Sequence, residues 1–282
     1  MKLAERFFKV FFWSISHLKD VAFGLENAMY AKRGTDYANS WNYRNDVEPA
    51  TETNEYVKDN RLKTYFDANT EGHGLFKFYH YFDAYDRHFS KFVGKEVHVV
   101  EVGVWSGGSL KMWQSYFGDK CKVYGVDIQD ACKAYENENV KIFIGDQENR
   151  EFWKDFKKKV PRVDILIDDG GHLAEQQIAT LEEMLPHISP GGVYLCEDVS
   201  GSRMKLTSYM NGIENEFNWI ENFSSDHIDS KATPFQQQID SIHQYPYIFV
   251  IEKRSEPVNQ LIAPQHGTIW APVYDPKKNA GG

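Results

Sequence analysis

Two acidic pairs follow short apolar segments in the second half of the chain, where carboxylates could bind a cation or a polar ligand. The pairs are Asp168-Asp169 and Glu197-Asp198. Each preceding segment has the length and apolar character of a strand buried in a parallel sheet. The carboxyl ends of such strands meet at one edge of the sheet, where α/β proteins bind ligands. Carboxylates gathered there repel one another, so the cluster needs a cation or raised pKa values to persist.

Carboxylate oxygens favour a hard cation such as Mg²⁺, Mn²⁺ or Ca²⁺, and the sequence lacks the combined cysteine and histidine set of structural zinc sites. We therefore expect Asp169, Glu197 and Asp198 to bind a divalent metal, with Mg²⁺ as the first candidate. Asp168 is expected to face a cofactor, and helix capping is the alternative role for some of these acids. His172 lies beside the predicted metal where a helix starts, and we expect a general base rather than a cap.

A glycine-rich turn in the first half of the predicted sheet forms a second candidate site. An apolar run ends beside Glu101 and is followed by Gly103, Gly107 and a helical segment that starts at Ser109. Glycines let the backbone approach a ligand closely, although a tight connection between strand and helix is the alternative explanation. The next apolar strand ends at Asp127, where an acid can accept both hydroxyls of a ribose. No Gly-Lys-Ser phosphate loop follows, so these residues predict a nucleoside ligand.

This arrangement resembles the class I methyltransferases that use S-adenosylmethionine (SAM), which carry an acid and glycines at the first turn and an acid after the second strand. The resemblance implies an α/β fold, a Rossmann-like, seven-stranded, mostly parallel sheet with helices on both faces. It also implies an adenine contact from Asp146, after the third strand. The implied SAM contacts are Glu101, Gly103, Gly107, Ser109, Asp127, Ile128, Asp146, Gln147 and Asp168.

An aromatic, histidine-rich segment precedes the glycine turn. Residues 70–74 form a predicted turn, and Glu71 in that turn is a further candidate for contact with the cofactor. Helical spacing follows and predicts core contacts for one set of side chains, while a second set could line the cofactor end of the sheet. The first set is Phe78, Phe82, Tyr85 and Phe89, and the second is Lys77, His80, Tyr81 and Arg87.

The length of 282 residues fits one large domain with an extension. We expect a helical extension and linker over residues 1–60, with the polar linker beginning at residue 34, and a methyltransferase domain over 61–275. Residues 200–244 are polar and predict a loop-like segment, for which a surface excursion is the default interpretation and a substrate lid the functional one. The last two strands are expected at 247–252 and near 267–270, and residues 276–282 form a tail.

Charge and cysteine content limit which partners and which cellular compartment the sequence favours. A formal net charge of −9 without a basic block argues against nucleic acid as a partner. Three cysteines without CxxC spacing are typical of reduced thiols, which predicts a cytoplasmic protein. The amphipathic segment 2–32 is too interrupted by polar residues to span a bilayer, and we expect it to pack on a subunit or on the main domain. Peripheral membrane contact is the less favoured alternative.

The motif Asp168-Asp169-Gly170-Gly171-His172, followed by Glu197-Asp198, resembles the metal-dependent sugar O-methyltransferases of the mycinamicin and macrocin group. By that resemblance the enzyme would transfer a methyl group from SAM to a hydroxyl of a sugar-containing small molecule or glycan. Asp169, Glu197 and Asp198 would bind the metal and His172 would be the base. The alternatives are a catechol-type enzyme, a cephalosporin-hydroxylase-like enzyme that uses SAM and metal, and a SAM-binding protein without catalysis.

Overall fold

The computed structural model describes residues 24–41, 60–199, 203–219, 230–264 and 266. The chain divides into two compact units, residues 1–55 and 56–282. The second unit holds a seven-stranded sheet in the order β3-β2-β1-β4-β5-β8-β7, and a short pair formed by β6 and β9. Strands β1 to β5 are parallel to their neighbours, and β8 is antiparallel to both β5 and β7. The predicted mostly parallel seven-stranded sheet is confirmed.

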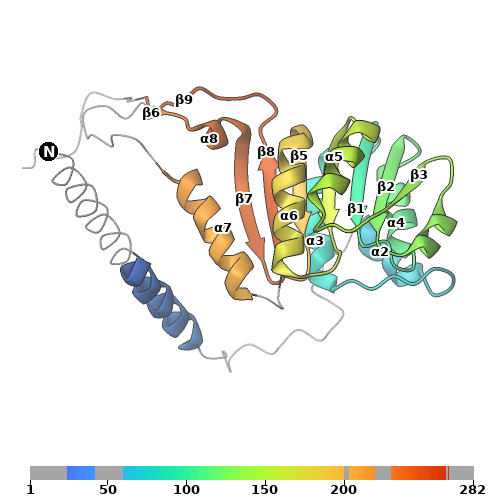
Figure 1. Ribbon diagram of the computed structural model, residues 1–282, viewed down its shortest axis with the longest axis horizontal. Helices are drawn as coiled ribbons and strands as arrows, with labels where there is room; N and C mark the ends of the chain where they lie inside the picture. Colours follow the sequence, from blue (N-terminus) through green and yellow to red (C-terminus); the bar gives the residue numbers. More distant parts are fainter. Residues whose placement is uncertain (1–23, 42–59, 200–202, 220–229, 265, 267–282) are drawn as a thin grey trace, which may run out of the picture. The chain divides into compact units, whose positions relative to one another are not determined.

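The strands are β1 (Val97–Val102), β2 (Cys121–Asp127), β3 (Val140–Ile144), β4 (Val163–Asp168), β5 (Ile188–Cys196), β6 (Ser230–Lys231), β7 (Ile239–Tyr245), β8 (Ile248–Lys253) and β9 (Gln260–Leu261). The α-helices of the second unit are α2 (Arg61–Ala68), α3 (Tyr79–Phe89), α4 (Gly108–Phe117), α5 (Arg150–Lys159), α6 (Ala174–Met184), α7 (Arg203–Phe217) and α8 (Pro234–Gln238). The labels are those of Figure 1.

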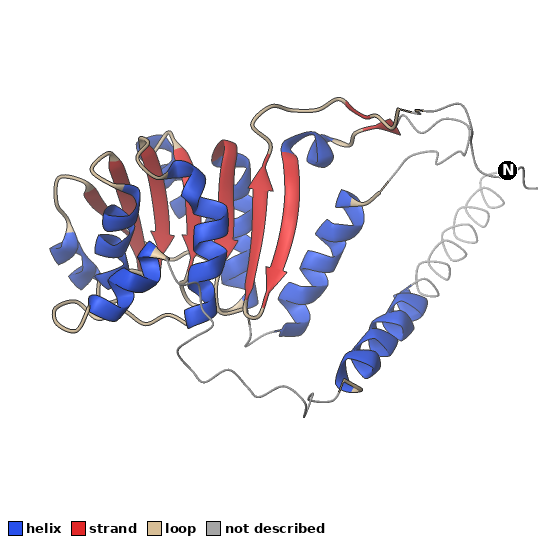
Figure 2. Cartoon of the chain, turned by 180° about the vertical axis from the view of Figure 1, so that it is seen from behind, coloured by secondary structure: helices blue, strands red, loops and turns tan. Residues whose placement is uncertain are grey.

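Helices lie on both faces of the sheet (Figure 2), and a hydrophobic layer packs against each face. Alternate residues of a strand point to opposite faces, so Val99 packs in one layer and Val100 in the other. Helices α2, α3 and α4 supply the first layer, with Phe82 and Trp113 fully buried. Helices α5, α6 and α7 supply the second, which includes the fully buried Trp153. The loops that follow the parallel strands are therefore held on a rigid, three-layered support.

The hairpin that completes the sheet differs from the predicted one. Strand β8 lies where a strand was expected, but its partner is β7, which precedes it, and the predicted strand near 267–270 lies outside the described residues, as does the predicted tail. The expectation of a loop over residues 200–244 is wrong for α7, α8 and β7. Leu206 and Met210 of α7 are buried in the second hydrophobic layer, so this helix is amphipathic. Its many polar residues made the segment resemble a loop.

The first unit contains a helix over residues 24–39, whose side chains are exposed. The predicted linker start at residue 34 is wrong, since the helix continues past Gly34 and Lys32 pairs with Asp36 one turn later. Residues 1–23 and 42–59 lie outside the described part, so most of the predicted N-terminal segment is not described. Among the described residues, no helix has the length and apolar character that crossing a bilayer requires.

Gly103, in the turn after β1, is expected to tolerate no side chain. Its φ is +87°, and a Cβ atom there would lie 2.0 Å from the backbone oxygen of Asp169. Gly94 is a matched control because its φ is +74° and open space surrounds it. Gly94→Ala should lower the free energy of unfolding by about 1–2 kcal/mol, because alanine is strained in the left-handed conformation. Gly103→Ala should lower it by about 2 kcal/mol more, because its side chain would also overpack the turn. Urea unfolding measures both, and equal losses would contradict the close approach.

Candidate functional site

A cavity of about 590 Å³ opens at the carboxyl ends of the parallel strands, within the size range of cofactor sites. It is lined after β1 by Gly103, at the end of β2 by Asp127, after β4 by Asp169 and after β5 by Asp198. The topology thus brings residues from four separate strands, spread over about a third of the chain, to one pocket. This is the edge at which the acidic pairs were expected to meet.

Strained backbone conformations gather around this cavity. Trp105, His172 and Asp198 line it and have φ values of +46°, +57° and +52°. Among the described residues, the one other non-glycine residue with positive φ is Tyr247. Such conformations cost free energy and persist where the surrounding structure enforces them, which is commonly at functional sites. The backbone at His172 and Asp198 therefore indicates that these two side chains are held in place by the fold.

Three potential metal ligands converge inside the cavity. Asp169, His172 and Asp198 each offer one ligand atom, and these atoms lie within 4.8 Å of one another. His172 Nε2 is 3.7 Å from Asp198 Oδ2, and His172 Nδ1 is buried without a hydrogen-bond partner. Two carboxylates and an unpartnered imidazole nitrogen suit a divalent cation. The side chains at this point fit the predicted metal, although the converging set differs from the predicted one.

Glu197, the remaining predicted ligand, is bound by protein groups instead. Lys77 donates to Glu197 Oε2 at 2.7 Å and to Asp169 Oδ2 at 2.5 Å, and its side chain is only 3% exposed. The hydroxyl of Tyr85 donates to Glu197 Oε1 at 2.6 Å. Both carboxylate oxygens of Glu197 are therefore occupied. Glu197 is also absent from the group of ligand atoms that converge at Asp169, His172 and Asp198.

Tyr81 completes the polar wall, donating its hydroxyl to Asp198 Oδ1 at 2.5 Å. Lys77 and Tyr81 were among the residues considered for this end of the sheet, and both line the cavity. His80 and Arg87 were considered with them but do not line it; His80 contacts the backbone oxygen of Pro246 instead. Helical spacing predicts a core position for Tyr85, and Tyr85 is buried, but its hydroxyl also donates to Glu197. Spacing indicates which face of a helix is buried, but not which polar group a buried hydroxyl contacts.

The electrostatics of Lys77 and Glu197 are dominated by their burial and by each other. Burial lowers the pKa of Lys77, but the charges of Glu197 and Asp169 more than offset it and raise that pKa well above its usual value. Burial and then the charge of Asp169 raise the pKa of Glu197, against the opposing effect of Lys77. Lys77 is thus a charged ammonium that supplies the positive charge this acidic cluster requires.

The nucleoside half of the cavity is formed at the ends of β2 and β3. Asp127 Oδ2 accepts hydrogen bonds from the backbone N–H groups of Val104 and Trp105, at 2.9 and 3.0 Å. Asp127 therefore fixes the glycine-rich turn as well as facing the cavity. Asp146 and Gln147 line the cavity from the end of β3. The predicted contact residue Ile128 also lines it and is 66% exposed.

Several predicted cofactor contacts do not line the cavity. Glu101 is fully buried and accepts from Ser109 Oγ and Trp113 Nε1, so Glu101 and Ser109 support the turn from behind. Asp168 is fully buried and accepts from Gln147 and Tyr194, because its side chain points into the second hydrophobic layer. For these positions the prediction of direct cofactor contact is not supported by their placement.

Gly107 and Glu71 are also absent from the cavity lining. Gly107 has a φ of +75° as the residue that caps helix α4, and a Cβ atom there would meet the ring of Tyr135. A glycine is therefore required here by the conformation of the turn and by the contact with Tyr135. Glu71 is exposed in the turn before Gly74. Its assignment depended on closeness in sequence to the first strand, which did not bring its side chain to the cavity.

Burial of Glu101 should make the stability of the protein depend on pH. Burial raises the pKa of Glu101 from 4.5 to about 7, against the opposing effects of Lys77, Trp113 and Ser109. A raised folded-state pKa gives stability that is fully present below pH 4.5 and is lost as the pH rises through about 7. The loss should be about 3 kcal/mol. Thermal unfolding of Glu101→Gln should therefore vary less with pH than that of the wild type.

The control for this measurement is Glu175→Gln, which changes an exposed glutamate at the start of α6. It should keep the pH dependence of the wild type. A Glu101→Gln variant whose stability falls as steeply as that of the wild type between pH 4.5 and about 7 would show that Glu101 is not the group that titrates.

Comparison with known protein families matches residues 100–199 to a family model described as a methyltransferase domain. The chain contains a methyltransferase domain. The matched residues run from β1 to the end of β5, so they include the glycine turn, Asp127, Asp169, His172 and Asp198. The resemblance to class I methyltransferases, predicted from these motifs, is confirmed.

Named relatives of the methyltransferase domain modify sugars of natural products. Mycinamicin VI 2''-O-methyltransferase of Micromonospora griseorubida is 38% identical over 133 residues, which are 44% of this chain and 33% of that protein. L-olivosyl-oleandolide 3-O-methyltransferase of Streptomyces antibioticus is 32% identical over 67% of this chain and 45% of its own length. The chain spans between about a third and a half of the length of the curated relatives it matches.

A solved structure with a similar fold is the MycE methyltransferase of the mycinamycin biosynthetic pathway in complex with Mg, SAH and mycinamycin VI. It superposes with a TM-score of 0.57 and is 26% identical, covering 71% of this chain and 54% of its own. The fold of the methyltransferase domain is therefore shared with an enzyme solved with a metal, a spent cofactor and a sugar-bearing compound.

Proposed function

We propose that this protein transfers a methyl group from SAM to a hydroxyl group of a sugar-containing small molecule or glycan, with a divalent cation, most simply Mg²⁺, as a second cofactor. The observation that carries the proposal is the convergence of Asp169, His172 and Asp198 in the cavity that Asp127 also lines. A nucleoside-binding acid and a cation-binding group thus share one cavity. The likeness to sugar O-methyltransferases and to MycE supports the choice of cofactor and acceptor.

Within the proposed site, Asp169 and Asp198 would hold the cation through their carboxylate oxygens, and His172 beside them would act as the base and not as a ligand. A bound divalent cation lowers the pKa of a hydroxyl that it contacts. His172 takes the hydroxyl proton on Nε2, and Asp198 Oδ2, 3.7 Å away, stabilises the resulting positive charge. The acceptor oxygen and the methyl group are held in line, so proximity supplies much of the rate. No covalent intermediate with the protein is required.

Exposed aromatic side chains at the cavity support a sugar-bearing acceptor. Phe76 and Trp105 line the cavity while 70% and 71% exposed, and Phe78 lines it at 42%. Phe78 stacks on Tyr247 with ring centroids 5.8 Å apart. Large apolar side chains left exposed in a group mark a binding surface. Their flat faces suit the apolar faces of a sugar ring and of the molecule that carries it.

Calorimetric titration of SAM and S-adenosylhomocysteine into the full chain tests the cofactor half of the proposal. Both should bind, and Asp127→Ala should weaken S-adenosylhomocysteine about 100-fold, because two hydrogen bonds to a charged group are lost. Asp130→Ala is the matched control, since Asp130 is exposed and does not line the cavity. Because Asp127 also holds the turn, thermal unfolding must accompany the titration. A folded wild type that binds neither compound would exclude the proposed activity.

Methyl transfer to defined acceptors tests the other half. The panel should include mycinamicin VI, demethylmacrocin, simpler glycosides and a catechol, each with Mg²⁺ and with a chelator. Methylation of a glycoside that stops on chelation supports the proposal. Methylation of the catechol alone would favour the catechol-type alternative, and SAM binding with no turnover on any acceptor would favour a binding protein without catalysis.

The cysteines and the helix over residues 24–39 bear on the compartment and the partner of the protein. The cytoplasm is the proposed compartment, supported by three free, buried cysteines. We propose that the helix over residues 24–39, which exposes Leu25, Met29 and Tyr30, packs against a second copy of the chain. Light scattering that finds a monomer, together with sedimentation on lipid vesicles, would favour membrane contact instead.

A further inference from the structure

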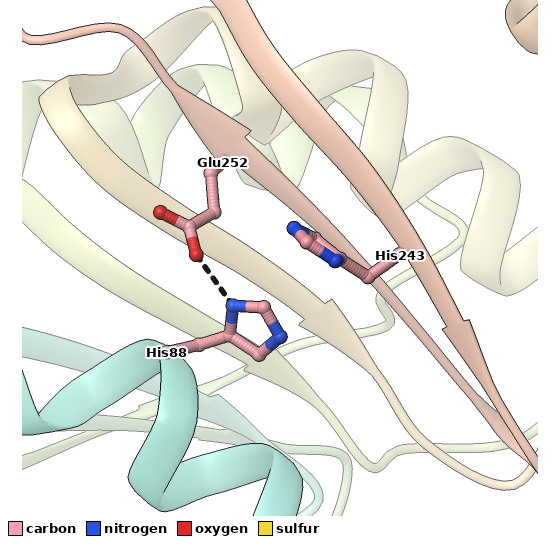
Figure 3. Close-up of side chains that lie close together, drawn as sticks. All are labelled: His88, His243 and Glu252. Atoms are coloured by element: carbon pink, nitrogen blue, oxygen red, sulfur yellow. Dashed lines mark hydrogen bonds and ion pairs between the residues drawn. The ribbon is translucent and has the colours of Figure 1, made fainter.

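A second group of metal-ligand side chains lies outside the cavity, between helix α3 and the β7–β8 hairpin (Figure 3). His88 comes from α3, His243 from β7 and Glu252 from β8, and each offers a ligand atom within 4.8 Å of the others. His88 is 1% exposed, and the ring centroids of the two histidines are 4.6 Å apart. Residues 155 positions apart along the chain thus meet in a largely buried spot.

The contacts around these residues orient their donor atoms. His88 Nδ1 lies 2.5 Å from Glu252 Oε1, while its Nε2 lies 2.9 Å from the hydroxyl of Tyr245. Lys91 donates to Glu252 Oε2 at 2.7 Å, so the ammonium occupies the oxygen that does not face His88. A histidine that binds a metal through one nitrogen commonly hydrogen-bonds through the other. These contacts therefore hold His88 Nδ1 and Glu252 Oε1 facing each other, next to the ring of His243.

This group is distinct from the acidic site. None of its three members lines the cavity. In the sheet, Glu252 pairs with Val193, three residues before Cys196 at the carboxyl end of β5, which corresponds to about 10 Å along the strand. Its composition also differs, because two imidazoles and one carboxylate favour Zn²⁺ over the hard cations that the acidic site suits.

We propose that His88, His243 and Glu252 form a zinc site that fastens helix α3 to the β7–β8 hairpin. His88 would bind through Nδ1 and Glu252 through Oε1, leaving the contacts of Tyr245 and Lys91 in place. A tetrahedral Zn²⁺ with ligands at about 2.0–2.1 Å separates its ligand atoms by about 3.3 Å. To reach that geometry, His88 Nδ1 and Glu252 Oε1, now 2.5 Å apart, would separate to admit the ion, and the His243 nitrogen already lies within 4.8 Å of both. The fourth ligand is a water molecule.

The site has a structural consequence for the cavity. Helix α3 begins just after Lys77 and carries Tyr81 and Tyr85, which contact the acidic cluster, and the hairpin turn carries Tyr247. A metal that joins α3 to this hairpin would hold in place the helix that carries Tyr81 and, because Tyr247 stacks on Phe78, a second residue of the cavity lining. Zinc should therefore raise the thermal stability of the whole domain without taking part in methyl transfer.

Zinc titration of the chelator-treated full chain tests the proposal. Asp169→Asn with Asp198→Asn serves as background, so that the acidic site cannot bind the metal. One equivalent of Zn²⁺ should bind, Co²⁺ should give the intense visible absorption of a tetrahedral site, and the unfolding temperature should rise. His243→Ala should weaken zinc about 100-fold or more and abolish the rise, and Glu252→Gln gives an independent second variant. His80→Ala, which changes a half-buried histidine of α3 outside this group, is the matched control.

Two results would overturn the zinc site. The first is a background protein that binds no zinc at micromolar concentration. The second is zinc affinity and thermal shift that are the same in His243→Ala and Glu252→Gln as in the background, which would assign the metal to other residues.

Discussion

Replacing His172 by asparagine is expected to slow methyl transfer by about 10²- to 10⁴-fold, the usual contribution of a general base. The affinity for S-adenosylhomocysteine should change by less than about threefold, because the proposed role concerns the acceptor proton and not the cofactor. Asparagine is the informative replacement, since it tolerates the left-handed backbone that His172 adopts at φ +57° and cannot act as a base. Single-turnover kinetics with an unmethylated glycoside that the wild type accepts measure the rate.

His80→Ala is the matched control, because His80 is a half-buried histidine that does not line the cavity. It should transfer methyl groups at the wild-type rate. If His172→Asn loses cofactor affinity and rate together, His172 holds the loop after β4 and is not the base. If the rate is unchanged, another group removes the proton.

Replacing Lys77 by methionine is expected to destabilise the folded protein by about 3–5 kcal/mol, the cost of removing one partner from a buried ion pair. The variant leaves Asp169 and the 1% exposed side chain of Glu197 facing each other without a counter-charge. A divalent cation can supply that charge. Mg²⁺ should therefore bind the variant more tightly than the wild type and raise its unfolding temperature by more.

Lys253→Met separates this effect from the simple loss of a buried lysine. Lys253 is as buried as Lys77, but its ammonium donates to backbone oxygens, including that of Ile188 at 2.7 Å. Its replacement should destabilise the protein without increasing the response to Mg²⁺. The same Mg²⁺ response in both variants would mean that the ammonium of Lys77 and the metal do not compete.

The fold could be predicted from sequence because apolar runs and glycine turns are local signals. Strand β2 ends at Asp127 as predicted, and helix α4 begins at Gly108, one residue before the predicted start at Ser109. Strand β7 was missed because its polar and apolar residues alternate in a surrounding polar segment. The segment was therefore assigned to a loop, although Ile239 is buried and His243 half-buried.

The acidic edge of the site could be predicted for the same reason, since each acid directly follows a strand. Lys77 could not be assigned a role, because it meets Asp169 92 residues and Glu197 120 residues later. Spacing along the chain carries no information about such pairs. Glu101 and Asp168 show the converse limit. They lie at the expected strand ends, but the alternation of side chains turns them into the hydrophobic layers, where protein groups satisfy them.

The order of strands has a consequence for how the domain avoids association. Residues 193–196 of β5 are fully buried and pair on one side with β4 and on the other with β8. A chain that ended before Ile239 would leave β5 as an edge strand with unpaired backbone groups and apolar side chains, which is a template for aggregation. The hairpin thus moves this free edge of the sheet from the apolar β5 to β7, which carries polar residues among its apolar ones and is only partly buried.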